Sequence, residues 1–457
     1  MHLFSDLWTA RAWILGFGFG LSLVVGFLYA FFLRVPGVLR LMVWGSIFAT
    51  ITMFFVVGAE SYAYAERKGA EDPPVVEQSI IDGARYAAYG LWAVGALGII
   101  AFCCLRSQIK TAMGCVREAS RAMAKMPIII LFPILQGAGL ILFMTAFLYY
   151  GVYLASMGTP STREVAIDSM FGEQFSTVIK FRTFEYEPFV EYSAWYLLFC
   201  FFWTSQFILS MGEIIVAMAV SRWYFTRDKS RIGNMTVLRS ICASTWYHAG
   251  TAAFGSLIIA VIKIFRVIVA KMQERAERMD AKIAKVLLCM LQCCLCCLEK
   301  CMRFINKNAY IQTAIFGSGF CASGRRAFFL VLRNAARVSA ISFVSAGILF
   351  VGRLFVTGVT CAASYYALNE RLEGQLHSPV GPVVLIAIIG YFVGGTFMSV
   401  FDMGITTVLH CYVADREMFG EDGESYAEGK LKEWIDESKN DYGGTIVTSK
   451  AGRDTRV

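Results

Sequence analysis

Charged residues inside apolar segments are the groups of this chain that could do chemistry. Glu213 lies in the apolar stretch Ser210–Val216, seven residues before Val220, or roughly 10 Å from the end of a helical span at about 1.5 Å per residue. At that depth in a bilayer a carboxylate costs about 2.5–3.5 kcal/mol on insertion scales, so it should face water, a base or a cation. Lys263 and Arg266 are possible basic partners. A salt bridge or a protonated acid between packed helices is the alternative to a cation site.

Two further charges lie in apolar runs. Arg353 lies seven residues before Thr360 and can extend its side chain outward along the helix, which indicates a structural role. Asp402 lies in the last apolar run, where a carboxylate tends to face a cavity or a partner. It could pair with Arg353 or with a base at the inner side, and we expect its charge to matter.

Catalytic motifs are absent from the sequence. The four histidines form no HExxH motif, and there is neither a GxSxG motif nor a P-loop. We therefore expect no catalytic residue, no bound metal and no cofactor. A transporter, a channel or a scaffold remains.

The elements that must position these residues are long apolar runs. The chain has 457 residues, of which 57% are hydrophobic and 17% charged, and its mean hydropathy is +0.57. A soluble protein carries about 25% charged residues. This composition excludes a disordered chain, a nucleic-acid module and an ordinary cytosolic enzyme. It predicts a polytopic membrane protein.

Nine runs could cross a bilayer, and because lipid does not tolerate unpaired backbone, each should be a helix. The seven strong runs are 12–33, 41–58, 87–105, 127–154, 194–220, 338–360 and 380–411, and the two weaker ones are 251–270 and 286–297. We therefore predict an all-α, polytopic helical membrane protein with about nine membrane segments, seven of them strong, in a single bundle.

The distribution of basic residues predicts the orientation. Segments 106–126, 221–249 and 302–337 are rich in Lys and Arg and nearly free of acids, whereas 59–86 and 157–193 are net acidic. The positive-inside rule places the first three in the cytosol. The segment 271–285 carries both signs, so 251–297 either crosses twice or is re-entrant. Both alternatives leave the C-terminus in the cytosol.

Four motifs follow one another along the chain. They are Ala253–Ala260 after Tyr247-His248, the Cys-rich stretch running into Leu298-Glu299-Lys300 and then Asn306–Ile311, Arg326-Ala327-Phe328 with Leu332-Arg333-Asn334, and Phe401-Asp402-Met403 through Cys411 into Asp415-Arg416-Glu417. Together they resemble the choline transporter-like family. The resemblance covers roughly residues 190–420, and the N-terminal spans match in hydropathy alone.

The resemblance implies a ten-helix architecture and passage of choline or a related organic cation across the plasma membrane. Members of the family usually begin with a further membrane helix and a large extracellular loop. This chain starts at what looks like their second span, so we expect about nine helices and an N-terminus outside.

Choline is a quaternary ammonium, which is recognised by aromatic faces and a nearby carboxylate. Trp203 and Phe207 are spaced i, i+4 on one helix face, and Tyr391 lies inside the last span. Interfacial or packing roles are the alternative for each of these rings. Pro133 precedes Gln136 in the fourth span, which is typical either of a discontinuous, substrate-lining helix or of a simple kink.

The predicted substrate-binding residues are thus Glu213, Trp203, Phe207, Gln136, Tyr391 and Asp402. We expect a transporter domain over 1–420 and a polar cytosolic tail over 421–457. The expected partners are a small choline-like cation and the lipid bilayer, without nucleic acid. A scaffold or lipid-handling protein of the same fold is the alternative, and a cation channel is disfavoured because no filter-like motif is present.

Overall fold

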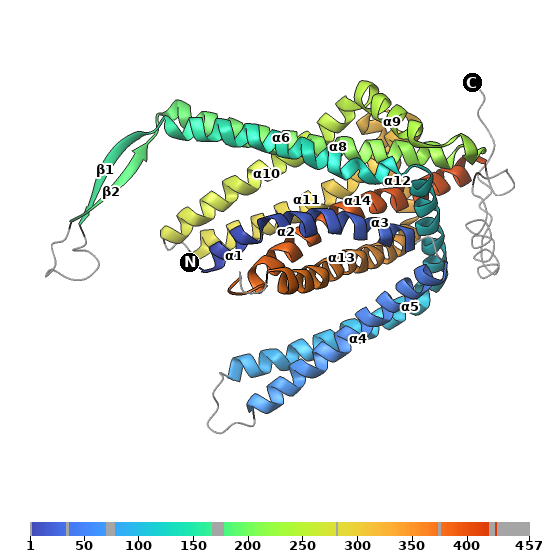
Figure 1. The fold of residues 1–457 in the computed structure, drawn as a ribbon, viewed down its shortest axis with the longest axis horizontal. Helices are drawn as coiled ribbons and strands as arrows, with labels where there is room; N and C mark the ends of the chain where they lie inside the picture. The colour runs from blue at the N-terminus through green and yellow to red at the C-terminus, as the bar shows by residue number, and fades with distance from the viewer. Residues whose placement is uncertain are drawn as a thin grey trace. The chain divides into compact units, whose positions relative to one another are not determined.

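The computed structural model describes residues 2–32, 36–69, 78–166, 178–279, 282–372, 376–419 and Tyr426. Helices dominate this part of the chain, beside one antiparallel pair of strands (Figure 1). The predicted all-α membrane architecture is confirmed. The predicted tail 421–457 lies outside the described residues except for Tyr426.

Among the described residues, seven helical segments are long and apolar enough to cross a membrane. They are Arg11–Tyr29, Leu41–Gly69, Leu131–Ser156, Pro188–Tyr224, Ala249–Arg278, Ile341–Arg371 and Val380–Met418. The run 251–270, which the sequence ranks as weak, is therefore part of a full membrane-length helix. The runs 87–105 and 286–297 are not among these seven, although both lie within long helices, Gln78–Lys125 and Lys282–Phe316.

The helices form two compact units, which are described separately. Unit 1 comprises Met1–Ile130, Ala219–Val237 and Phe329–Val457, and unit 2 comprises Leu131–Met218 and Leu238–Phe328.

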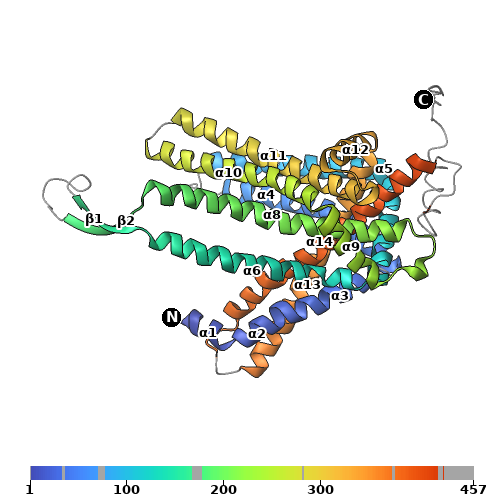
Figure 2. The same ribbon diagram turned by 90° about the horizontal axis from the view of Figure 1, so that it is seen from above.

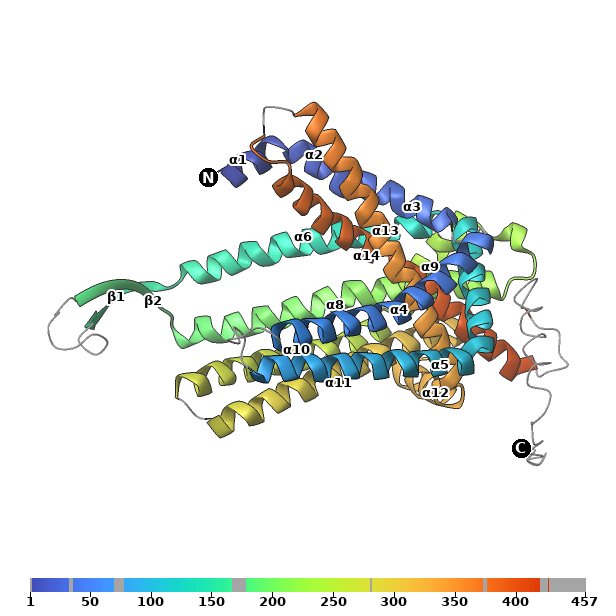
Figure 3. The same ribbon diagram turned by 90° about the horizontal axis from the view of Figure 1, so that it is seen from below.

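Unit 1 contains two long helical pairs and a broken N-terminal helix. Its main elements are α1 (His2–Thr9), α2 (Arg11–Leu15), the π-helical turn η1 (Gly16–Leu21), α3 (Ser22–Phe32), α4 (Pro36–Gly69), α5 (Gln78–Lys125), α13 (Ala335–Arg371) and α14 (Val380–Phe419). Helices α4 and α5 lie side by side, and so do α13 and α14 (Figures 1 and 3).

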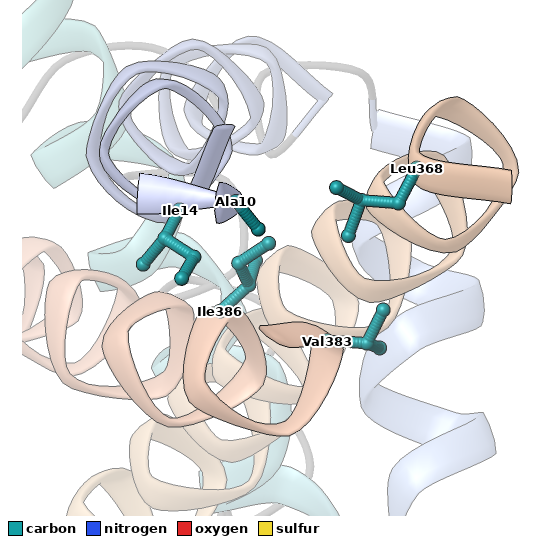
Figure 4. Close-up of a cluster of buried hydrophobic side chains, with 5 residues drawn as sticks. All are labelled: Ala10, Ile14, Leu368, Val383 and Ile386. Atoms are coloured by element: carbon teal, nitrogen blue, oxygen red, sulfur yellow. The ribbon is translucent and has the colours of Figure 1, made fainter. Parts of the chain in front are cut away.

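A small apolar cluster joins the start of the chain to α13 and α14. Ala10 and Ile14 face Ile386 of α14, and Leu368 and Val383 complete the cluster (Figure 4). Burial of such side chains from water or lipid headgroups contributes roughly 1.5–3 kcal/mol for each large one. The cluster therefore fixes the N-terminal helices against the end of α13 and the start of α14.

Glycines allow α14 to approach its neighbours closely. A Cβ on Gly390 would lie 3.2 Å from the Ser22 hydroxyl, and one on Gly394 would lie 3.3 Å from Val356 of α13. The GxxxG spacing of this pair is typical of helix–helix contacts in membranes. These glycines are contact positions.

Unit 2 holds most of the predicted site. Its elements are α6 (Ile128–Ser156), β1 (Thr159–Ala166), β2 (Val178–Glu185), α8 (Pro188–Tyr224), α9 (Asn234–Tyr247), α10 (Ala249–Arg278), α11 (Lys282–Phe316) and α12 (Phe320–Arg333). The first residues of α6 and α9 and the last residues of α8 and α12 belong to unit 1. The strands pair antiparallel with Thr159 opposite Glu185, which the sequence did not predict.

Two questions left by the sequence concern unit 2. Helix α6 continues through Pro133, so of the two alternatives left open for this proline, the structure does not show a discontinuous helix. Helices α10 and α11 are uninterrupted over 30 and 35 residues and pack side by side (Figures 2 and 3). Neither helix turns back part-way, but α10 is among the helices long and apolar enough to cross a membrane and α11 is not.

Candidate functional site

One face of α8 carries the central predicted residues. In an unbroken helix over Pro188–Tyr224, positions 203, 207, 210 and 213 follow one another at spacings of three or four and therefore share a face. The structure thus brings Trp203, Phe207 and Glu213 to one side of α8, and all three are half-buried. Trp203 and Glu213 are ten residues apart, about 15 Å along the axis.

Trp203 is held by α10. Its indole Nε1–H donates a hydrogen bond to the Ala253 carbonyl at 3.0 Å, and its ring lies 5.8 Å from that of Phe199. The polar edge of the indole is thereby satisfied. Its apolar faces do not need a hydrogen-bond partner and can receive a cation.

The part of this face around Ser210 and Glu213 contacts α11. The Tyr310 hydroxyl donates to Ser210 Oγ at 3.0 Å, and the charge of Glu213 acts on the same Tyr310 hydroxyl. A buried Asn306 donates its amide to the carbonyl of Gly255 at 2.8 Å. Glu213 therefore lies beside a hydrogen-bonded tyrosine in a polar environment within the unit.

Gln136 belongs to the same neighbourhood. From α6, its amide donates to the carbonyls of Ile208 and Leu209 at 2.9 and 3.2 Å. The side chain occupies the space in front of Gly212, where an added Cβ would lie 2.5 Å from Gln136 Nε2. Gln136 thus links α6 to the backbone of α8, a role that the sequence alone did not indicate.

An ionic network that the sequence analysis missed links α8, α10 and α11. The buried Glu299 accepts from Arg266 at 2.5 Å and from Arg303 at 2.7 Å. Arg303 also donates to the side chain of Gln206 at 3.0 Å. The i, i+4 spacing of Glu299 and Arg303 could have indicated their ion pair from the sequence. Nothing in the sequence indicated that Gln206 would join them.

The two bases considered as partners for Glu213 have other contacts. Arg266 pairs with Glu299, and the Lys263 ammonium lies 5.4 Å from the ring centroid of Phe202. Lys263 therefore faces the part of α8 that precedes Ser210, whereas Arg266 faces α11.

Tyr391 and Asp402 lie in unit 1, on α14. Tyr391 is 40% exposed and stands edge-on to Phe392, with ring centroids 6.3 Å apart. Asp402 is half-buried. Arg353 of α13 packs near Gly395, and its Nε is buried without a hydrogen-bond partner among the described residues.

Comparisons with known proteins all match one family. A sequence model described as the plasma-membrane choline transporter matches residues 89–417, a range that contains all six predicted site residues. The motif resemblance is therefore confirmed and extends further toward the N-terminus than the motifs did.

Named relatives match most of the chain. Choline transporter-like protein 2 of Dictyostelium discoideum is 29% identical over 445 residues, covering 95% of this chain and 68% of that protein. Choline transporter-like protein 1 of Xenopus laevis is 27% identical over 454 residues, covering 96% and 66%. A shorter match to choline transporter-like 2 of Anopheles gambiae reaches 35% over 218 residues, covering 48% and 28%. The chain thus spans about two thirds of the length of the relatives that it matches along most of its own length.

Proposed function

Since this chain belongs to the plasma-membrane choline transporter family, we propose that it carries choline or a related quaternary-ammonium or organic cation across a membrane. The family match over residues 89–417 is the observation that carries this proposal. The aromatic and acidic face of α8 supports it, because a quaternary ammonium cannot donate a hydrogen bond and binds through ring faces and carboxylates.

We assign the binding roles to the α8 face. The ring faces of Trp203 and Phe207 attract the ammonium group, and Glu213 supplies a negative charge nearer the inner end of the helix. Because Trp203 and Glu213 are about 15 Å apart along the axis, they act as successive stations on one path. Gln136 lies against this face from α6, where its amide oxygen can accept from the choline hydroxyl.

Tyr391 and Asp402 are proposed as additional substrate contacts on α14. An aromatic ring and a carboxylate on a membrane-length helix are the same pair of chemical groups that α8 presents. No catalytic role is proposed for any of the six residues, in keeping with relatives that are named as transporters.

We further propose a plasma-membrane location with the C-terminus in the cytosol. The support is the excess of Lys and Arg in segments 106–126, 221–249 and 302–337, which the positive-inside rule places in the cytosol. Residues 1–420 then form the transport domain, and 421–457 form a cytosolic tail.

Uptake of radiolabelled choline into liposomes containing the purified protein tests the function. Saturable uptake that unlabelled choline competes supports transport. Folded protein without such uptake would leave the alternative, a membrane scaffold or lipid-handling protein of the same fold.

The variant Glu213→Gln tests the site, because it keeps the shape and removes the charge. We expect slower uptake or a higher KM at normal membrane levels. Unchanged affinity and rate would assign Glu213 to helix packing. Glu274→Gln is the matched control, since Glu274 lies in an exposed pair with Arg278 on α10.

A further inference from the structure

An excess of positive charge lies among α8, α10 and α11. Lys263 stands at the middle of the 30-residue helix α10, and Arg266 follows one turn later. Arg303 of α11 joins them, and the charges of Arg266 and Arg303 both act on the Lys263 ammonium. Glu299 is the carboxylate that pairs with this group, through both arginines. Three cations therefore share one carboxylate.

Within the described residues, two donors in this group have no hydrogen-bond acceptor. The Lys263 ammonium lies 5.4 Å from the ring centroid of Phe202 and is attracted by the charge of Glu299 without a hydrogen bond to it. The Nε–H of Arg266 is buried and has no hydrogen-bond partner among the described residues. A buried donor without a partner costs about 1–3 kcal/mol, and more for a charged group.

The depth of the group makes this imbalance costly. A Lys or Arg at the centre of a membrane helix costs about 2.5–3.5 kcal/mol on insertion scales, and such residues pair with an opposite charge or face a water-filled cavity. Glu299 balances one of the three charges. A bound anion would balance another and accept from the two free donors.

We propose that Lys263, Arg266 and Arg303 form a binding site for a phosphate-type anion. Guanidinium groups present parallel N–H donors that match the oxygens of a phosphate, and a lysine ammonium adds a point charge with three donors. The anion is either free phosphate that enters by water or the phosphate of a lipid headgroup. The chemistry is the same for both sources.

This site is distinct from the proposed cation stations. The cluster contacts α8 at Phe202 and Gln206. Trp203 and Phe207 each come one position later, so they point about 100° away around the helix. Glu213 lies seven residues beyond Gln206, about 10 Å along α8. The proposal therefore does not rest on choline transport, and anion binding alone tests it.

Thermal unfolding of the purified full chain in detergent provides the test. The probes are inorganic phosphate, against chloride at equal ionic strength, and phosphatidylglycerol, against phosphatidylcholine. We expect a saturable rise in Tm with at least one anionic probe. A rise with phosphate alone indicates a free anion, and a rise with phosphatidylglycerol alone indicates a lipid headgroup.

Matched variants locate the site. Lys263→Met should weaken the apparent affinity roughly tenfold or more, as expected for loss of one charge-assisted hydrogen bond, while Lys263→Arg should retain it. The control is Lys271→Met, because Lys271 lies on the same helix and also stacks on an α8 ring, 4.6 Å from the centroid of Trp195. Lys263→Gln replaces the Met variant if that protein does not fold.

Two results would overturn the proposal. One is a wild-type Tm that neither anionic probe raises beyond its matched control. The other is an equal loss of binding in Lys263→Met and Lys271→Met, which would indicate nonspecific attraction to a basic helix.

Discussion

The indole of Trp203 on α8 donates a hydrogen bond to the carbonyl of Ala253 on α10 at 3.0 Å. Ala253 begins the motif by which the sequence resembles its family, so the bond joins a predicted binding residue to that motif. It also fixes the edge of the indole and leaves the ring faces for other contacts.

Two variants separate the ring of Trp203 from its hydrogen bond. Trp203→Phe keeps an aromatic face and loses the bond, whereas Trp203→Leu loses both. Since a cation–π contact contributes about 0.5–2 kcal/mol, we expect KM for choline to rise by roughly 2- to 30-fold more in the Leu variant. Equal KM values in the two variants would mean that the ring face does not contact substrate.

Gly255 is required by the packing of α10 against α11. A Cβ at this position would overlap the Tyr310 hydroxyl and lie 2.9 Å from the Phe320 ring. Gly255→Ala should therefore destabilise the protein by about 1–3 kcal/mol through overpacking, seen as a lower Tm. Gly250→Ala on the same helix is the control, because nothing lies within 4 Å of its added Cβ. A similar loss in both variants would point to a general helix effect.

Gly212 and Gln136 should behave as a coupled pair. Gly212→Ala places a Cβ where the Gln136 amide lies and should break its bonds to the α8 carbonyls. We expect the loss of stability to be smaller in a Gln136→Ala background, with a coupling energy of about 0.5–3 kcal/mol, the range typical of residues in contact. A double-mutant cycle of Tm or denaturation midpoints measures it, and additive effects would contradict the contact.

Glu299 should matter far more than a surface acid in a similar pair. Glu299→Gln leaves Arg266 and Arg303 without a counter-charge, which costs about 3–5 kcal/mol for a fully buried pair and less here because both arginines are partly exposed. Glu274→Gln removes the acid of the exposed Arg278 pair and should change stability by about 0–1 kcal/mol. The unfolding midpoints of the two variants are compared with that of the wild type. Equal losses of stability in both variants would mean that Glu299 has no special structural role.

The hydrogen bonds that Asp6 of α1 accepts from the residues just before α14 should depend on pH. Asp6 accepts from the backbone N–H groups of His377 and Ser378 at 3.0 and 3.2 Å. These bonds, that of His377 foremost, lower the pKa of the Asp6 carboxyl from its usual 3.8, although burial acts to raise it. The folded pKa is thus below the unfolded one, so the stabilisation is present above pH 3.8 and is lost as the pH falls through the folded pKa.

The Tm difference between wild type and Asp6→Asn measures how much the Asp6 carboxylate contributes to stability. We expect the wild type to be more stable at neutral pH and the difference to shrink as the pH falls below about 4. A difference that is constant across this range would show that the charge of Asp6 does not contribute.

The apolar runs determined the helical membrane class, since a chain in lipid must satisfy its backbone within helices. Hydropathy was less decisive for α11, which is not among the membrane-length apolar helices although α10, against which it packs, is one of them. Glu299 lowers the hydropathy of α11 and yet is buried between Arg266 and Arg303. A window average does not distinguish a polar face turned inward from a segment that leaves the membrane.

The sequence by itself determined which residues of α8 share a face, because the helical period follows from spacing alone. It also carried the family resemblance in its motifs. Tertiary structure decided which helices meet that face: that Gln136 bonds to α8, that Glu299 rather than Glu213 binds Arg266, and that Lys263 lies over Phe202. The partners in each pair lie on different helices, 33 to 72 residues apart in the sequence. Contacts of that kind depend on how helices pack and turn about their axes, which local spacing does not encode.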